Sequence, residues 1–380
     1  MNNNSPTEYI GIDQINLLNR FLEEDEPKNI FLVTGKSSFL TSGLSKKIKK
    51  ILEGYNFVQF NDFETNPKYE DIKEGKDLFL KNNCDFIVAA GGGSAIDVAK
   101  CVNIYQSNPE NFESIIADSS LIENKGVSLV AIPSTAGTGS EATHFAVIYK
   151  DNVKYSIAHP YLLPNCAIVD AQFTFDLPPY ITACSGFDAL CQAIESFWSV
   201  QASEISKGYA RKAIIKIREN LLNSIRESNQ KSRQQMAHAA LLSGKAINIT
   251  KTTAPHAISY PLTTDFGIPH GHAVALTLGY FFEINENFED EIKVNDQRGA
   301  SYVKNTMKEL RTIFNWRSPE ESREKWLELM TQAGLGISFK ELKLEDLDIK
   351  DIASRVNIER LINNPIPITN STLVKVLSFL

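Results

Sequence analysis

The chain has 380 residues, which exceeds the length at which one hydrophobic core usually divides, so two domains are expected. With 43% hydrophobic and 22% charged residues its composition is that of a globular protein, and no run of about 18 apolar residues predicts a membrane span. The net charge of −7 is spread along the sequence without a basic stripe, which argues against nucleic acid as a partner.

The first residues and the cysteines indicate a reducing compartment. The N-terminal stretch lacks the charged and apolar regions of a secretory signal. The five cysteines are an odd number without C-x-x-C spacing, so we expect buried free thiols rather than disulfides or metal ligands. The sequence therefore predicts a cytoplasmic protein.

Short apolar runs alternate with helical patterns in the first half of the chain. Continuous apolar strands separated by helices predict a parallel sheet covered on both faces. Two further runs joined around Asp151-Asn152 predict a β-hairpin inserted into this α/β unit. The predicted strands are 29–35, 57–60, 85–90 and 127–132, the helical segments are 44–52 and 69–82, and the hairpin strands are 146–150 and 153–157.

After Pro178-Pro179 the pattern becomes helical, for example at 181–200, 203–222 and 233–247. Proline starts a helix and cannot continue a central strand, so this pair marks the predicted domain boundary. Asn370-Ser371 is expected to cap a last helix. The prediction is an α/β Rossmann-like domain (1–177) followed by an all-helical domain (178–380).

Gly91-Gly92-Gly93-Ser94 follows a predicted strand and opens a predicted helix. Glycines let the backbone approach a ligand, and a helix N-terminus offers free N–H groups to a pyrophosphate. Ser94 and Asp97 resemble a capping box that fixes the helix start. The pattern is not G-x-G-x-x-G, because Ile96 replaces the last glycine, and a tight turn without a ligand explains the same residues.

A second polar loop, PSTAGTGSE at 133–141, follows the next predicted strand. Hydroxyl residues interleaved with glycine suit hydrogen bonding to a nucleotide at the carboxyl edge of a parallel sheet. An ordinary surface loop is the alternative. Two such loops at successive strand ends favour the nucleotide interpretation.

Asp188 and Gln192 are four residues apart in a helical pattern and so share one helix face. His256 and His270 follow, and three of the six histidines fall between His256 and His272. A carboxylate, two imidazoles and an amide oxygen suit a divalent ion. Each residue alone is explained more simply as a solvated or capping group, and it is the set that favours a metal.

These residues resemble the iron-containing alcohol dehydrogenase family. The resemblance implies the dehydroquinate synthase-like fold, with a nucleotide-binding domain, a helical metal domain and a cleft where hydride passes from nicotinamide to a metal-bound carbonyl. It also implies a homodimer or larger assembly. The matching stretches are 91–100, 133–143, 154–170, 188–196 and 256–276.

By this resemblance Asp188, Gln192, His256 and His270 bind the ion, with Fe²⁺ favoured and Zn²⁺ or Mn²⁺ as alternatives. The family usually has histidine where Gln192 stands. Glutamine is neutral like imidazole, but its oxygen is a harder and weaker ligand, which is expected to lower zinc affinity most. The dinucleotide site implied by the family comprises Gly91, Gly92, Gly93, Ser94, Asp97, Ser134, Thr135, Thr138 and Lys154.

Within the family the chain is most similar to the subgroup that reduces phosphonoacetaldehyde to 2-hydroxyethylphosphonate. A phosphonate needs charged donors, and Lys251, shortly before His256, is the candidate. A solvated lysine favoured by the helix dipole explains Lys251 almost as well. The proton donor is metal-bound water, Tyr260, His272 or His144, and the sequence does not choose among them.

The first strand ends at Gly35-Lys36-Ser37, where the adenosine ribose is expected. Members of the family that prefer NADH have an aspartate where Gly35 stands, which binds the ribose hydroxyls and repels a 2′-phosphate. Without that carboxylate, Lys36 and Ser37 can bind the phosphate, so NADPH is predicted. If Gly35 merely turns the chain, both cofactors are accepted.

The predicted function is a metal-dependent NAD(P)H oxidoreductase that interconverts a small aldehyde and a primary alcohol. A general short-chain alcohol dehydrogenase is the first alternative. A fold-related sugar-phosphate lyase is another, although it would be expected to carry a glutamate-based metal set and more basic substrate residues. A silent binding protein that lost activity with the change to Gln192 is disfavoured by the retained loops and ligands.

Overall fold

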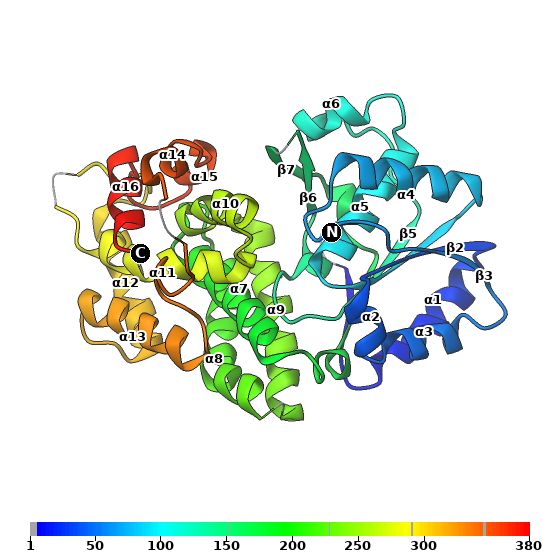
Figure 1. The fold of residues 1–380 in the computed structure, drawn as a ribbon, viewed down its shortest axis with the longest axis horizontal. Coiled ribbons are helices and arrows are strands. Elements are labelled where there is room, and N and C mark those ends of the chain that lie inside the picture. Colours follow the sequence, from blue (N-terminus) through cyan, green and yellow to red (C-terminus); the bar gives the residue numbers. More distant parts are fainter. Residues whose placement is uncertain (1–5, 152, 228, 290–291, 345–346) are drawn as a thin grey trace. The chain divides into compact units, whose positions relative to one another are not determined.

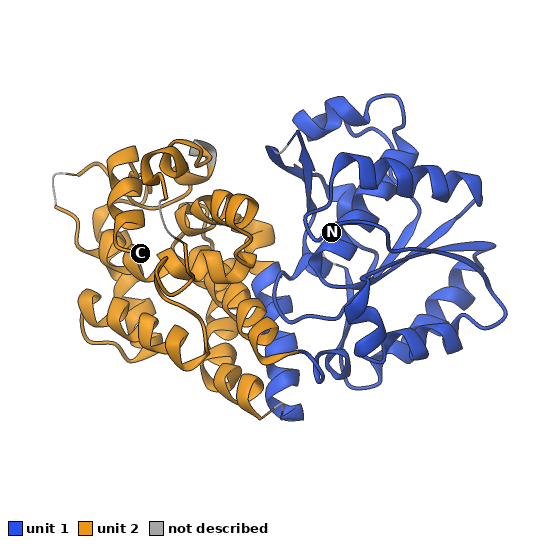
Figure 2. Cartoon of the chain, viewed as in Figure 1, with its two compact units in different colours: residues 1–177, 228–244 blue, residues 178–227, 245–380 orange. Residues whose placement is uncertain are grey.

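The computed structural model describes residues 6–151, 153–227, 229–289, 292–344 and 347–380. The chain forms two compact units, coloured separately in Figure 2. Unit 1 comprises Met1–Leu177 and Ser228–Gly244, and unit 2 comprises Pro178–Glu227 and Lys245–Leu380. Segment 228–244, which the sequence placed in the helical domain, therefore groups with the α/β unit. Helix α9 (Gln230–Thr250) carries this segment and continues into unit 2.

Unit 1 contains a six-stranded parallel sheet with strand order β1-β8-β5-β4-β2-β3. Strands β2, β3 and β5 of this sheet are labelled in Figure 1. The four predicted strands are confirmed to within one residue at each end. Two short strands were missed: β1 has mixed exposure, and β8 has only four apolar residues before Asp170, a run in which periodicity does not separate a strand from a helix. The strands are β1 (Thr7–Gly11), β2 (Asn29–Thr34), β3 (Asn56–Phe60), β4 (Phe86–Gly91), β5 (Ser128–Pro133) and β8 (Cys166–Asp170).

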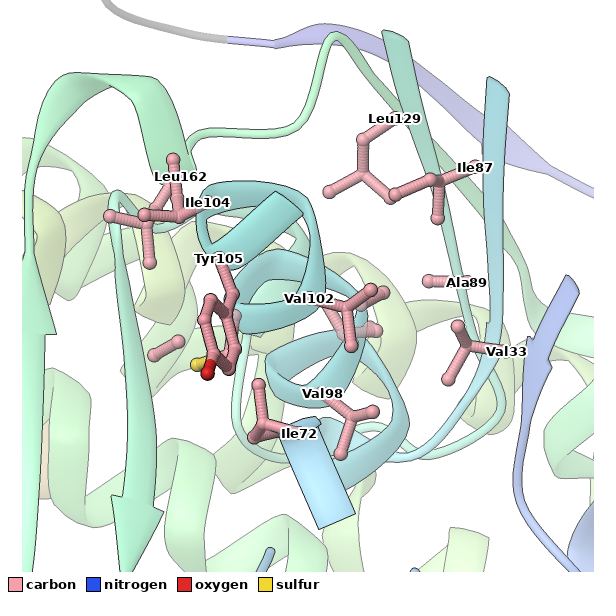
Figure 3. Packing of buried hydrophobic residues seen from close by; sticks show 14 of the residues in the cluster. Val33, Ile72, Ile87, Ala89, Val98, Val102, Ile104, Tyr105, Leu129 and Leu162 are labelled. Atoms are coloured by element: carbon pink, nitrogen blue, oxygen red, sulfur yellow. The ribbon is translucent and has the colours of Figure 1, made fainter. Parts of the chain in front are cut away.

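Side chains of β4 alternate between two hydrophobic cores, as expected for a sheet buried on both faces. Ile87 and Ala89 face the core under α4, α5 and α6, part of which is drawn in Figure 3. Val88 faces the opposite core, under α1, α2 and α3. The helices are α1 (Leu18–Asp25), α2 (Ser37–Thr41), α3 (Leu44–Ile51), α4 (Tyr69–Lys81), α5 (Gly93–Ser107) and α6 (Phe112–Ala117).

The predicted hairpin is confirmed as the antiparallel pair β6 (Phe145–Lys150) and β7 (Val153–Ala158). Ala146, Ile148 and Ile157 pack into the core that α5 covers. Its turn includes Asn152, which lies outside the described residues. The hairpin is thus anchored to unit 1 by apolar burial.

Two contacts explain why the first part of α9 belongs to unit 1. The buried guanidinium of Arg233 donates to the carbonyl oxygens of Thr174 at 2.6 Å and Leu177 at 3.2 Å. Gly139 lies so close to Gly244 that a β-carbon on Gly139 would be 2.5 Å from the Gly244 α-carbon. The loop after β5 is therefore fixed on α9 by a contact between residues far apart in the sequence.

The described part of unit 2 is built from helices, and α7 begins at Pro179. The last helix is capped by Thr369, whose hydroxyl accepts from the Thr372 N–H at 3.2 Å, and not by the predicted Asn370-Ser371. All three residue types are good caps, so the sequence could not fix the position. Among the described residues no helix is long and apolar enough to cross a membrane. The helices are α7 (Pro179–Trp198), α8 (Glu204–Arg226), α10 (Ala254–Phe266), α11 (His270–Glu286), α12 (Ala300–Phe314), α13 (Pro319–Gln332), α14 (Ile349–Ser354), α15 (Ile358–Ile362) and α16 (Asn370–Ser378).

Candidate active site

Three side chains of unit 2 converge: Asp188 of α7, His256 of α10 and His270 at the start of α11. One donor atom from each lies within 4.8 Å of the others. His256 Nε2 is 3.5 Å, and His270 Nε2 3.9 Å, from Asp188 Oδ1. Ligands that bind one ion at about 2.0–2.2 Å stand roughly 3–3.5 Å apart, so only a small adjustment is needed. The residues present fit a divalent ion.

The Ser259 hydroxyl orients His270. It donates to the carbonyl oxygen of His256 at 2.7 Å, so it accepts from His270 Nδ1 at 3.3 Å. The hydrogen of His270 therefore lies on Nδ1, and the lone pair on Nε2 faces Asp188. The half-buried Tyr260 ring stacks on the His270 ring, with centroids 6.1 Å apart.

Glu195 is a buried carboxylate in this centre that the sequence analysis missed. Its Oε1 lies 2.8 Å from His256 Nδ1. Burial lowers the pKa of His256, but the Glu195 and Asp188 carboxylates outweigh it and raise that pKa to about 10. A divalent ion therefore competes with a proton for the imidazole. The available signal was the spacing of Asp188, Gln192 and Glu195, which places three polar groups on one face of an apolar helix.

Gln192 is buried one turn after Asp188 on α7, as the predicted helix face requires. Gln192 and Asp188, the carboxylate of the predicted ligand set, are therefore on the same helix. Coordination by its amide oxygen stays a prediction.

The predicted proton donors differ in their surroundings. His272 is fully buried, with Nε2 2.7 Å from the Gly336 carbonyl oxygen and Nδ1 3.1 Å from the Tyr180 hydroxyl. Because a carbonyl only accepts, Nε2 carries the hydrogen and Nδ1 accepts from Tyr180. Burial also lowers the pKa of His272. Both ring nitrogens are thus engaged inside unit 2, which favours Tyr260 over His272 as the donor.

Lys251 follows the last residue of α9 and has a left-handed backbone, with φ of 58°. Its side chain is exposed, and the ammonium group makes no hydrogen bond or ion pair within the described part of the chain. Asn363 Nδ2 donates to the carbonyl oxygens of Thr250 at 2.8 Å and Thr252 at 2.9 Å. These bonds hold the backbone on both sides of Lys251.

The glycine-rich turn opens α5 with Gly92 as its N-cap residue, and no side chain caps it. The predicted capping box is wrong because Ser94 lies inside the first turn of the helix. Its hydroxyl donates to the Thr65 carbonyl oxygen, whereas Asp97 accepts from the Ser140 hydroxyl and the Val147 N–H. Asp97 therefore anchors the neighbouring loop and hairpin, and the helix N-terminus remains available to an anion.

Of the three glycines in this turn, two are required by close packing and one is not. A β-carbon on Gly91 would lie 2.8 Å from the Ala95 β-carbon, and one on Gly93 would lie 2.7 Å from Thr138 Oγ1. At Gly92 it would meet only Thr135 at 3.7 Å, and the φ of −73° suits any residue. The fold does not require glycine at 92, whereas a phosphate that approached this backbone closely would require it. The turn fits a dinucleotide pyrophosphate.

The loop after β5 is held by Lys100, a lysine without exposed surface. Its Nζ donates to the carbonyl oxygens of Ser140 at 2.6 Å, Thr143 at 2.9 Å and Phe145 at 2.9 Å. Within this loop Ser134 is buried, while Thr135 and Thr138 are half-buried. A buried cation thus fixes the loop to α5.

Residues predicted to contact the cofactor follow β2, β4 and β5, which are neighbours in the sheet. At the end of β2, Lys36 forms an ion pair with Asp62 at 3.0 Å, and both side chains are mostly exposed. Gly35 is half-buried and Ser37 is exposed, while Lys154 is half-buried in β7. Most of the residues predicted to bind the cofactor therefore lie at the carboxyl ends of the sheet strands.

Comparison with known proteins identifies the family. The iron-containing alcohol dehydrogenase model matches residues 6–171, and the model of the C-terminal part of Fe-containing alcohol dehydrogenases matches residues 182–379. The chain belongs to the iron-containing alcohol dehydrogenase family. It is 33% identical over 290 residues to an NADPH-dependent butanol dehydrogenase of Clostridium saccharobutylicum, covering 74% of each chain. It is 33% identical over 264 residues to a 1,3-propanediol dehydrogenase of Citrobacter freundii, covering 68% of each.

Solved structures agree over nearly the whole length. A sulfoacetaldehyde reductase from Bifidobacterium kashiwanohense in complex with NAD+ is 30% identical with a TM-score of 0.88, covering 99% of this chain and 96% of the other. An alcohol dehydrogenase from Oenococcus oeni is 26% identical with a TM-score of 0.88, covering 99% and 98%. The chain is thus an NAD(P)-dependent aldehyde/alcohol oxidoreductase with a divalent metal site at Asp188, His256 and His270. The family therefore disfavours the two alternatives, a sugar-phosphate lyase and a binding protein without activity.

Proposed function

We propose that this enzyme reduces a short aldehyde with a terminal oxyanion, converting phosphonoacetaldehyde to 2-hydroxyethylphosphonate with NADPH. Asp188, His256 and His270 would hold the divalent ion, with Gln192 as a fourth ligand. When bound, such an ion supplies Lewis-acid polarisation of the aldehyde oxygen. Tyr260, stacked on His270, is the proposed proton donor to the product oxygen.

The observation that carries this proposal is the backbone of Lys251. A left-handed conformation costs a residue with a β-carbon roughly 1–2 kcal/mol, and glycine is the usual residue just after a helix. Here an exposed lysine occupies the position, with φ of 58°. A charged side chain at a strained backbone position, five residues before His256, supports a ligand role.

An ammonium group can donate charge-assisted hydrogen bonds to a phosphonate or to a sulfonate, because both present charged acceptor oxygens. The likeness to sulfoacetaldehyde reductase, at 30% identity, supports an aldehyde of this class. The residues around Gln192 and His256 favour the phosphonate, by their resemblance to phosphonoacetaldehyde reductases.

A second candidate is reduction of uncharged short-chain aldehydes. It is favoured by the 33% identity to the butanol and 1,3-propanediol dehydrogenases. In that case Lys251 has no oxyanion to bind, and its removal affects all aldehydes alike.

NADPH is proposed because Gly35 has no carboxylate to repel a 2′-phosphate, while Lys36 and Ser37 are exposed beside it. The ion pair of Lys36 with Asp62 opposes this preference, since a phosphate must compete with that carboxylate. Such an exposed pair is worth about 0–1 kcal/mol, which a doubly charged phosphate can outweigh.

The test compares phosphonoacetaldehyde, sulfoacetaldehyde, acetaldehyde and butanal as substrates of the metal-loaded enzyme. Lys251→Ala should raise KM for the two anionic aldehydes roughly ten- to a hundred-fold, because a charge-assisted contact contributes about 1.5–3 kcal/mol. KM for the two neutral aldehydes should change little. Lys212→Ala, at an exposed lysine of α8, is the matched control and should leave all four values unchanged.

A further variant separates binding from folding. Lys251→Gly should be at least as stable as the wild type, because glycine relieves the left-handed strain, yet it should lose the anionic substrates as Lys251→Ala does. Equal KM effects on charged and neutral aldehydes would remove Lys251 from the substrate site and favour the second candidate.

A further inference from the structure

Glu195 of α7 has no exposed surface, and both of its carboxylate oxygens receive N–H groups from one neighbouring segment. Oε1 lies 2.8 Å from His256 Nδ1, and Oε2 accepts from the Thr253 backbone N–H at 2.6 Å. A buried carboxylate without partners is strongly unfavourable. These two contacts are therefore what allows a charged group at this depth.

The first contact selects one form of the His256 ring. A carboxylate only accepts, so the hydrogen of the neutral imidazole lies on Nδ1 and the lone pair on Nε2. Nε2 is the atom that faces Asp188 Oδ1, at 3.5 Å. Glu195 thus fixes both the tautomer and the direction of the ring that a metal ligand requires.

The second contact fixes the helix that carries His256. Thr253 is the N-cap residue of α10, and its own side chain does not cap that helix. The Glu195 charge lies at the N-terminus of α10, where a negative charge is favourable. Because Glu195 and Asp188 are both on α7, one carboxylate ties two ligand-bearing helices together.

Glu195 also balances charge. With neutral His256, His270 and Gln192, the Asp188 carboxylate offsets one of the two charges of a divalent ion. Glu195 supplies the second negative charge in the same buried region. Bound ion and surrounding carboxylates are then neutral together, which lowers the cost of burying the ion.

We propose that Glu195 is a positioning residue that sets the metal affinity of this centre by orienting His256 and anchoring α10 to α7. The inference rests on metal binding at Asp188, His256 and His270. It assigns a function to a residue that touches neither substrate nor the ion.

The test measures the zinc dissociation constant of the full chain by competition with a chromophoric chelator. Glu195→Gln keeps the shape, but it has one accepting oxygen and places an NH₂ group against an N–H donor. Zinc should bind about 10–100-fold more weakly, the usual effect of losing such a partner. Asp296→Asn is the control: it makes the same carboxylate-to-amide change at a buried residue outside the ligand-bearing helices, where Asp296 Oδ2 pairs with Arg298 at 2.6 Å, so zinc affinity should stay near wild type.

A measurement on the wild type needs no variant to fold. After zinc loading, imidazole ¹⁵N spectra should show His256 protonated at Nδ1 and metal-bound at Nε2; zinc on Nδ1 would overturn the proposal. So would a zinc affinity of Glu195→Gln equal to wild type while Asp188→Ala has lost binding. If Asp188→Ala also binds zinc normally, the metal centre itself is misplaced and both conclusions fail.

Discussion

Gly271 lies directly against the backbone of Cys184: a β-carbon on Gly271 would stand 2.0 Å from the Cys184 carbonyl oxygen. The same atom would be 2.7 Å from the Asp188 β-carbon. No side chain fits at position 271, so at this point α11 contacts α7 through its backbone. This contact brings His270, the preceding residue, beside Asp188.

Gly271→Ala should therefore displace His270 from Asp188. We expect a loss of about 1–3 kcal/mol in stability from overpacking, together with at least tenfold weaker zinc binding. Gly279→Ala is the control, because Gly279 is also on α11 but lies away from the ligands. Its β-carbon would stand 2.8 Å from the ring of Trp326 on α13. It should lower the melting temperature while zinc affinity stays unchanged. Normal zinc binding by Gly271→Ala would show that the helix contact does not place His270.

Gln192 offers a test of its own coordination. If its amide oxygen binds the ion, Gln192→His should raise zinc affinity, because imidazole is the softer and stronger donor. Gln192→Leu, of similar size without a donor, should lower it. Competition between Zn²⁺, Fe²⁺ and Mn²⁺ measures both effects. The same metal preference in all three proteins would place Gln192 outside the ligand set.

Cofactor choice depends on the end of β2. Gly35→Asp should lower kcat/KM with NADPH by an order of magnitude or more and spare NADH, since the carboxylate repels the 2′-phosphate. The new β-carbon meets only the Ser38 hydroxyl, at 2.7 Å, which can rotate away. Asp62→Asn should have the opposite effect, because it releases Lys36 from its ion pair. A wild type that uses NADH better, or a ratio that neither variant changes, contradicts this account.

Stability should depend on pH through Glu141, which is buried in the 3-10 turn Ser140–Ala142. Burial raises its pKa from 4.5 to about 7; Lys100 lowers that pKa and Glu8 raises it. The folded chain keeps the proton to higher pH than the unfolded chain, so the free energy of unfolding falls as pH rises from 4.5 to about 7. The loss is about 3 kcal/mol at most.

Urea unfolding of the wild type and Glu141→Gln checks this dependence. The variant cannot ionise, so its stability relative to the wild type should increase between pH 5 and pH 7 and then level off. A constant difference across that range would mean that Glu141 titrates normally.

The sequence predicted those features that local patterns encode. Short apolar runs located strands β2, β3, β4 and β5, and the spacing of Asp188 and Gln192 placed both on one helix face. The clustering of histidines between His256 and His272 pointed to the two imidazoles, and the resemblance to a family supported the set as metal ligands. By contrast, β8 was missed because four consecutive apolar residues before Asp170 have no period that separates a strand from a helix.

Long-range contacts lay beyond local patterns. Nothing in the sequence showed that Arg233 bonds Thr174, and so the predicted boundary after residue 177 left segment 228–244 with the helical domain. The capping box failed because Ser94 lies two residues past the N-cap residue Gly92 and is the second residue of the helix. Glu195 was missed because a glutamate in a helix is usually solvated, and only the fold shows His256 against it.

The central claim is that Asp188, His256 and His270 hold one ion on which aldehyde reduction depends. The direct measurement is a titration of the metal-stripped chain with Zn²⁺ or Fe²⁺, following bound metal and NADPH-dependent aldehyde reduction in the same samples. The rate should rise in proportion to bound metal and saturate at one ion per chain. Asp188→Ala should neither bind nor turn over, whereas Asp25→Ala, at an exposed carboxylate of α1, should match the wild type. Full activity in the metal-stripped wild type or in Asp188→Ala would contradict the account.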